Sequence, residues 1–202
     1  IKAGSFEDGD RMENLDVIFA KRYIDAWQAY RQQQPITNSW AHAFATAKQP
    51  LTAIQHLLLG INTHINLDLA IAAATTAPGD RIFLLQNDFE KINEIIATLA
   101  DGVQEKLSKI WWPMKWLTRI SNGSEKAVLN FSIQKARQAS WANAIAMAAM
   151  NNQQQQVYIT QLDATVLILG KKIESPGTLP NLLLAPVRWL EYKEVPKVAQ
   201  LL

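Results

Sequence analysis

Apolar residues recur at intervals of three and four along most of the chain, which is the spacing of one face of an α-helix. In the first such stretch they include Met12, Leu15, Phe19 and Tyr23. No stretch of useful length alternates strictly between apolar and polar residues, as a half-exposed strand would. The pattern therefore predicts an all-α bundle of about six to eight helices, packed largely antiparallel because the connections are short. The expected helices cover roughly residues 11–33, 38–48, 50–74, 82–101 with a continuation to about 110, 114–120, 124–150, 156–174 and 181–192.

Local signals suggest where some of these helices begin. Asp10 suits the N-cap of the first helix, with Glu13 three residues on in a capping-box arrangement. Pro50 suits the first position of the central helix, 50–74. The polar tract Asn151–Gln156 is interpreted as a solvated connection between two helices.

The bulk composition limits the function classes. With 202 residues and an ordinary apolar content, we expect a single domain spanning 1–202. A net charge of +2 with scattered charges of both signs argues against a nucleic-acid partner. The absence of cysteine excludes disulfides and thiolate chemistry. No stretch reaches the roughly 20 apolar residues of a transmembrane segment. We expect a cytoplasmic protein by default, although the chain starts at Ile1 and a removed signal peptide stays open, as does the oligomeric state.

The central helix is unusual because its polar residues are amides, imidazoles and one carboxylate rather than Lys and Glu. At about 100° per residue, His64 and Asp68 share one flank of its apolar stripe, and Asn62 lies on the other flank. We therefore expect the helix to be surrounded on most sides. Its buried polar groups must then be paired, since an unpaired one costs about 1–3 kcal/mol. The helix holds together either a polar network or a ligand.

The ligand interpretation is a metal ion. His64 and Asp68 at i, i+4 could reach one ion, with His56 nearby, and Glu13 and Asp16 on the first helix could supply further carboxylates. Imidazole and carboxylate ligands suit Zn, Mn or Fe without selecting among them. In the structural interpretation, His64 and Asp68 bond to each other and to helix carbonyls, while the amides stitch neighbouring helices together.

Other polar and aromatic residues could line a binding site for a small molecule. The candidates for contacting a substrate are Asn62, Arg137 and Trp141, the last two sharing a face of the long helix. For Arg137 we slightly favour a surface arginine lying over a packed tryptophan. Asp163 sits beside the apolar stripe of its helix, and we interpret it as a half-exposed aspartate rather than a buried acid.

Three strings in the sequence resemble a known family. Gln55–Leu69, QHLLLGINTHINLDL, is similar to the signature QHLLLGINAHINLDL of a bacterial all-α family of unknown function. The segments Phe6–Asp16 and Phe19–Tyr23 also look like that family, and the resemblance spans most of the chain. Thr63 stands where the family usually has Ala. The family implies no established activity.

A remoter resemblance is to the all-α zinc-dependent phospholipase C and nuclease group, in which a helical His-x-x-x-Asp binds metal. His64 and Asp68 match that pair. The full three-zinc site needs more histidines than His42, His56 and His64, so this resemblance implies at most a one- or two-metal version.

Two functional hypotheses follow. The first is a metal-dependent hydrolase acting on a phosphoester or lipid-like substrate. The second is a non-catalytic helical module that binds a partner or an apolar ligand, with a purely structural central helix. They differ in whether the polar side chains converge on an open site or on a closed hydrogen-bonded network.

Overall fold

The computed structural model describes residues 4–92, 95 and 124–176, and these residues form helices and connecting loops without any strand. The all-α prediction is therefore confirmed. The expected helices at 114–120 and 181–192, and most of 96–110, lie outside the described residues. The described elements are α1 (Gly9–Arg31), α2 (Asn38–Ala45), the 3₁₀ turn η1 (Thr46–Lys48), α3 (Ala53–Thr63), the π-helical η2 (His64–Asp68), α4 (Leu69–Thr76), the 3₁₀ segment η3 (Gly79–Leu85), α7 (Ser124–Ala148) and α8 (Asn152–Glu174). Residues 86–92 are also helical.

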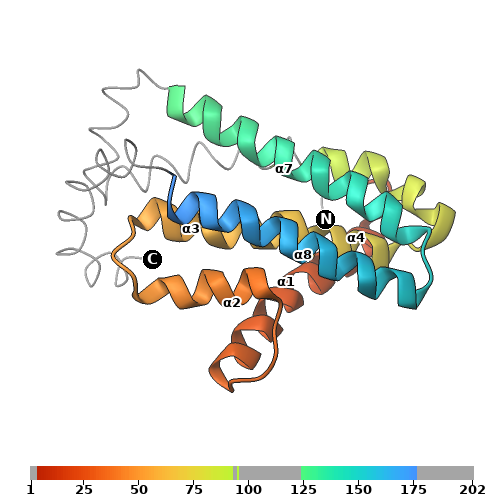
Figure 1. The fold of residues 1–202 in the computed structure, drawn as a ribbon. Coiled ribbons are helices and arrows are strands. Elements are labelled where there is room, and N and C mark those ends of the chain that lie inside the picture. The colour runs from red at the N-terminus through yellow and green to blue at the C-terminus, as the bar shows by residue number, and fades with distance from the viewer. Residues whose placement is uncertain (1–3, 93–94, 96–123, 177–202) are drawn as a thin grey trace.

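The predicted central helix is a single run from Ala53 to Thr76, made of α3, η2 and α4 (Figure 1). It begins three residues later than expected, because Thr52 rather than Pro50 organises its first turn. The Thr52 hydroxyl accepts from the Gln55 N–H, and the Gln55 side chain accepts from the Thr52 N–H, which completes a capping box.

Two other expected helix starts are corrected in the same way. The N-cap of α1 is Asp8, not Asp10, because the Asp8 carboxylate accepts from the Arg11 N–H at 3.0 Å. The polar tract after residue 150 is not a connection: Asn151 caps α8 and bonds reciprocally with Gln154. In each case several polar residues stood in a row, and local sequence alone did not decide which one capped the helix.

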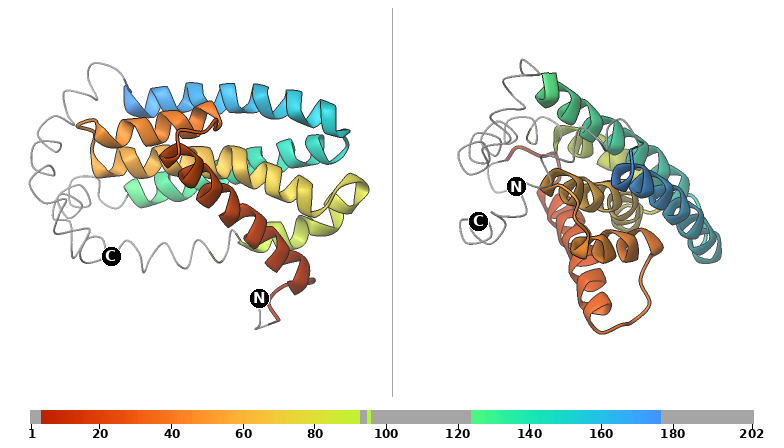
Figure 2. Two further views of the ribbon diagram at one scale, coloured as in Figure 1. Left: turned by 90° about the horizontal axis from the view of Figure 1, so that it is seen from below. Right: turned by 60° about the vertical axis from the view of Figure 1, so that its left-hand side comes forward.

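The other helices surround this central run. α4 packs on α7, α3 packs on α8 and α2, and α1 crosses α4 and η2 obliquely (Figure 2). α7 and α8 are joined by a short turn and run side by side in opposite directions. Burial is most complete in α4, where every residue from Leu69 to Ala74 is buried. Small alanines there allow neighbouring helices to approach closely, which accounts for the apolar core around α4.

The helix Gln55–Thr76 is also the one described helix long and apolar enough to cross a membrane by length and composition. Most of it is buried inside the bundle. Burial by other helices explains its apolar character, as expected for the core helix of a soluble protein.

Candidate functional site

Asp68 is the centre of a buried polar cluster where α1, α2 and the central helix meet. The residue has 0% exposure. Its Oδ1 accepts from Arg22 Nε at 2.8 Å, and its Oδ2 accepts from the indole N–H of Trp40 at 2.9 Å. His64 Nδ1 lies 3.1 Å from the same Oδ2. Three side chains from three helical segments thus converge on one carboxylate, which satisfies the rule that a buried charge must be paired. We call Arg22, Trp40, His64 and Asp68 the Asp68 cluster.

The backbone at this point is π-helical. The Leu69 N–H donates to the His64 carbonyl, five residues back instead of four. His64 and Asp68 are the first and the last residue of this π-helical segment. π-helical turns inside α-helices occur frequently at functional sites.

His64 is held on its other faces by aromatic rings. Its imidazole stacks on Phe19 of α1, with ring centroids 3.8 Å apart and an interplanar angle of 9°. Tyr23 lies next along α1, with its centroid 6.0 Å from that of His64. With Nδ1 turned toward Asp68, the ring leaves Nε2 without a hydrogen-bond partner among the described residues, and 26% of the His64 side chain is exposed.

Arg22 also uses only part of its hydrogen-bonding capacity. Its Nε is used by Asp68, whereas the two terminal nitrogens make no hydrogen bond within the part of the chain that the structure describes. The side chain is 29% exposed. A guanidinium edge with two parallel donors matches the oxygens of a phosphate or a carboxylate. The Asp68 cluster therefore leaves His64 Nε2 and the terminal nitrogens of Arg22 available to a ligand, while buried Asp68 holds both side chains in place.

Of the five residues predicted to bind a metal, the structure brings together two, His64 and Asp68. Glu13 is exposed on α1. Asp16 lies within the electrostatic reach of Arg137: burial raises the pKa of Asp16, and the positive charge of Arg137 works the other way. Across residues 4–92 and 124–176, no group of three or more His, Asp or Glu side chains could hold a metal ion. The Zn, Mn or Fe site thus stays a prediction without an assembled ligand set.

His56 lies on α3, two turns from His64. At 1.5 Å per residue the two are about 12 Å apart along the helix axis. Burial lowers the pKa of His56 from its ordinary 6.5, and a hydrogen bond to the backbone of Gln49 partly opposes that shift. His56 is therefore a partly buried histidine near the start of the central helix, and burial favours its neutral form.

The depressed pKa of His56 predicts a pH dependence of stability. Between the folded pKa and 6.5 the unfolded chain binds a proton that the folded protein does not, so stability falls as pH drops through that window. We expect His56→Gln to lose less thermal stability than the wild type between pH 7.5 and pH 5. Thermal unfolding followed by circular dichroism at both pH values measures this difference. An equal loss in the two proteins would contradict the expectation.

The amides of the central helix have structural partners, as the structural interpretation expected. Asn62 Nδ2 donates to the Val166 carbonyl at 2.9 Å, and Asn66 donates to Asn62 Oδ1 at 3.1 Å. Gln55 Nε2 donates to the carbonyl of Ile173 at 2.9 Å. The bonds from Asn62 and Gln55 fasten α3 to α8. Asn62 also lines a surface hollow between these two helices, and its predicted contact with a substrate stays a prediction.

Arg137 is not a surface arginine over a tryptophan, contrary to expectation. It is 4% exposed, donates through Nη2 to the Phe89 carbonyl at 2.7 Å, and lies over the Phe89 ring. Burial lowers the pKa of Arg137 to about 10, and Asp16 partly counteracts this shift. Trp141 also packs on Phe89, with its ring centroid 4.7 Å from that of Phe89. Arg137 and Trp141 therefore both contact Phe89, and neither makes a hydrogen bond to Asp68.

Asp163 was interpreted as half-exposed, and this was wrong. It is 4% exposed, and its carboxylate accepts from the backbone N–H groups of Asn38 and Ser39 and from both their side chains, at 2.6–3.1 Å. Thr37, the residue before α2, makes no side-chain capping bond. A carboxylate from α8 therefore caps α2 across 125 residues of sequence. Local patterns cannot reveal such a partner, and the same holds for Arg22 and Trp40 at Asp68.

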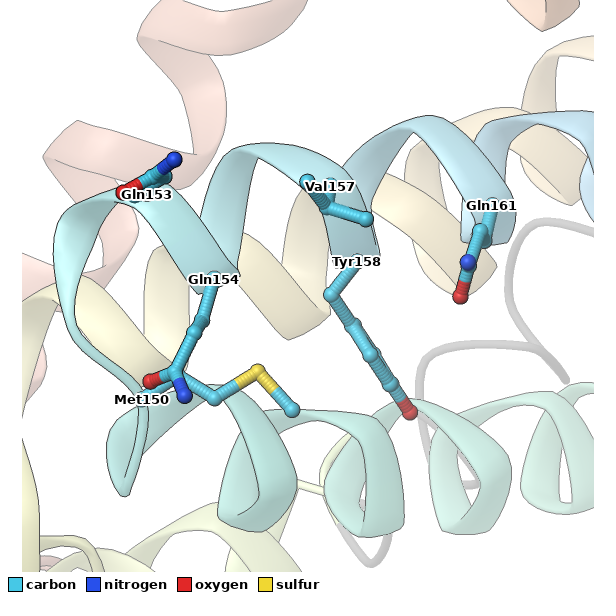
Figure 3. A pocket seen from close by; sticks show the side chains of 6 residues that line it. All are labelled: Met150, Gln153, Gln154, Val157, Tyr158 and Gln161. Carbon is cyan, nitrogen blue, oxygen red and sulfur yellow. The ribbon is translucent and has the colours of Figure 1, made fainter.

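Two surface hollows lie away from the Asp68 cluster. One, of about 390 Å³, lies over the start of α8 (Figure 3) and is lined by Met150, Gln153, Gln154, Val157, Tyr158 and Gln161. The other, of about 480 Å³, lies between α3 and α8 and is lined by Gln55, Leu58, Asn62, Leu169, Lys172, Ile173 and Pro176. Neither contains a catalytic pairing of side chains, so we place the candidate site at the Asp68 cluster.

Comparison with known proteins gives a family but no activity. Residues 1–176 match the family described as "Family of unknown function (DUF5995)". No curated protein and no solved structure matches the chain. The resemblance to a family of unknown function is thus confirmed, whereas the remote likeness to the zinc-dependent phospholipase C and nuclease group finds no support. Two of the three strings on which the family resemblance was based, Phe19–Tyr23 and Gln55–Leu69, meet at the Asp68 cluster.

Proposed function

The chain belongs to the DUF5995 family of unknown function, and we propose that it is a hydrolase that cleaves a small phosphoester at the Asp68 cluster. The observation that carries the proposal is the pairing of His64 Nδ1 with buried Asp68, which leaves Nε2 turned away from the carboxylate. A carboxylate–histidine pair of this kind orients an imidazole as a general base and stabilises its protonated form.

Each side chain then has a distinct role. The terminal nitrogens of Arg22 bind the non-bridging oxygens of the phosphoester. His64 Nε2 accepts a proton from a water molecule as the water oxygen forms a bond to phosphorus and the bond to the leaving alcohol oxygen breaks. Solvent water protonates the departing alkoxide, and the hydroxide that remains takes the proton from His64 Nε2 and restores the neutral imidazole. Asp68 does not change its protonation state, and Trp40 and Arg22 hold it in place.

The two earlier hypotheses now make different predictions at the same residue. General base catalysis by His64 needs no metal ion. The metal-dependent hydrolase requires ligands in addition to His64 and Asp68, and no group of three or more such side chains forms among the described residues. A purely structural network would make His64 matter for stability alone. One set of measurements separates the three.

The test is hydrolysis of p-nitrophenyl phosphate, bis(p-nitrophenyl) phosphate and p-nitrophenyl acetate by the purified protein. We expect turnover of a phosphoester and a loss of at least about 100-fold in kcat in His64→Gln, since general base catalysis contributes roughly 10²–10⁴-fold. Glu13→Gln, an exposed carboxylate on α1, is the matched control and should keep wild-type activity. Titration with inorganic phosphate should shift the His64 ring signals in NMR spectra, and Arg22→Gln should abolish that shift.

Several results would overturn the proposal. Activity that disappears with a chelator and returns with Zn, Mn or Fe would favour the metal-dependent hydrolase. A protein that turns over none of the substrates and shows no phosphate-dependent shift of His64 would favour the non-catalytic module. The latter would also predict that His64→Gln changes only the melting temperature.

A further inference from the structure

The rings around His64 continue as a partly exposed row along α1. Phe19, Tyr23 and Trp27 are spaced four residues apart and so lie on one face of the helix. Tyr23 and Trp27 are 43% and 41% exposed, and Ile24 between them is 49% exposed. From α2, Phe44 contacts Trp27 and Tyr30, with ring centroids 5.3 and 5.1 Å apart. We call Phe19, Tyr23 and Trp27 the aromatic row. It begins at Phe19, which stacks on His64 of the Asp68 cluster, and Phe44 of α2 packs behind it.

This row lies on the part of α1 that projects from the bundle. The C-terminal end of α1 and the loop to α2 extend beyond the other described helices (Figures 1 and 2). Rings that are exposed at a projecting end can reach a flat surface that the rest of the protein would not obstruct. Single exposed apolar residues are ordinary, but a continuous row of amphipathic rings marks an interaction surface.

The charges of α1 are divided along its length. Residues 17–31 contain three basic side chains and one acidic one: Lys21, Arg22, Arg31 and Asp25. Residues 4–16 contain five acidic side chains and one basic one: Glu7, Asp8, Asp10, Glu13, Asp16 and Arg11. Arg31 is exposed and has no ion-pair partner among the described residues. Lys21 is paired with Asp25 at 2.6 Å and Arg22 with Asp68 at 2.8 Å, so Arg31 carries the unpaired positive charge of residues 17–31. This charge at the aromatic end is complementary to a negatively charged surface.

We propose that the aromatic and basic end of α1 docks on an anionic lipid bilayer. Trp and Tyr side chains prefer the headgroup level of a membrane, where their apolar rings are buried and their polar atoms stay hydrated. Arg31 adds attraction to anionic headgroups. Arg22 immediately precedes Tyr23 of the row, and in this orientation its terminal nitrogens face lipid phosphates. Docking on a bilayer does not depend on the proposed hydrolysis, because vesicle binding is measured without any turnover of substrate.

The test is co-sedimentation of the full chain with vesicles. We expect binding to vesicles of phosphatidylcholine mixed with phosphatidylglycerol, weaker binding to phosphatidylcholine alone, and weakening by added salt. Arg31→Glu and Trp27→Ser should each lower the affinity for the mixed vesicles at least about fivefold. Val157→Ser on α8, which is 57% exposed, is the matched control and should bind like the wild type. Ile24→Ser replaces Trp27→Ser if the loss of the ring contacts of Trp27 prevents folding.

The proposal fails if the wild type binds neither kind of vesicle, or if Arg31→Glu and Ile24→Ser bind as well as the wild type. It also fails if this face captures a soluble protein while vesicle binding is absent. Vesicle binding with no hydrolysis of any phosphoester would support the docking surface and contradict the proposed function, so the two proposals are tested separately.

Discussion

Asp68→Ala is expected to destabilise the protein by about 3 kcal/mol, because removing one partner of a buried charge pair leaves the others uncompensated. Three donors lose their acceptor at once: Arg22 Nε, the Trp40 indole N–H and His64 Nδ1. The partial exposure of Arg22 and His64 allows water to solvate them, which keeps the estimate at the lower end. For a chain of this size we expect a fall in melting temperature of roughly 6–12 °C, measured by calorimetry or circular dichroism.

Two further variants make this expectation specific. Asp68→Asn keeps the shape and one acceptor but places an NH₂ group against a donor, so it should be destabilised as well, though less than Asp68→Ala. Glu13→Ala removes an exposed carboxylate from α1 and should change stability by no more than about 0.5 kcal/mol. If Asp68→Ala melted at the wild-type temperature, the Asp68 cluster would not hold α1 and α2 on the central helix.

Asp163→Ala is expected to have a comparable effect for a different reason. Asp163 supplies the N-cap of α2 from another helix, and loss of a cap costs about 0.5–2 kcal/mol. The Ser39 hydroxyl, also buried, would lose its acceptor, which costs a further 1–3 kcal/mol or so. We therefore expect a loss of about 3 kcal/mol in the free energy of unfolding, measured by urea denaturation.

The loss of stability in Asp163→Ala should begin at the N-terminus of α2. Hydrogen exchange should speed up first at the amides of Asn38 and Ser39, whose N–H groups bond to Asp163. Gln161→Ala, an exposed position on the same helix, is the control and should leave both stability and exchange unchanged. Unchanged exchange at Asn38 and Ser39 in Asp163→Ala would mean that another group caps α2.

Asp163→Ala and Asp68→Ala together distinguish a structural role from a catalytic role at the candidate site. Asp163 holds α2, and α2 carries Trp40 to Asp68. If the proposed hydrolase is correct, Asp163→Ala should retain activity at temperatures where it stays folded, since it contacts neither His64 nor Arg22. Asp68→Ala should lose activity even when folded, because His64 loses the group that orients its ring.

Much of the fold could be predicted from sequence because helix periodicity and helix breakers are local signals. The positions of α1, α2, the central helix and α8 followed from apolar spacing, with errors of a few residues at their ends. Those errors arose where several capping residues were adjacent, as at Asp8 and Asp10, and the choice depended on which backbone N–H the side chain reached. The pairing of His64 with Asp68 was also local, because four residues along a helix bring two side chains to one flank.

The sequence by itself thus determined that the protein is helical, that its central helix is enclosed, and that His64 and Asp68 are neighbours. Only the tertiary structure decided what surrounds them. Arg22 is 46 residues from Asp68 and Trp40 is 28 residues from it, and Asp163 reaches α2 across 125 residues. Such contacts depend on helix crossing angles and packing, which one-dimensional spacing does not encode. The same packing brings Arg22 and Trp40 to Asp68, while no group of three or more metal-ligand side chains forms among the described residues.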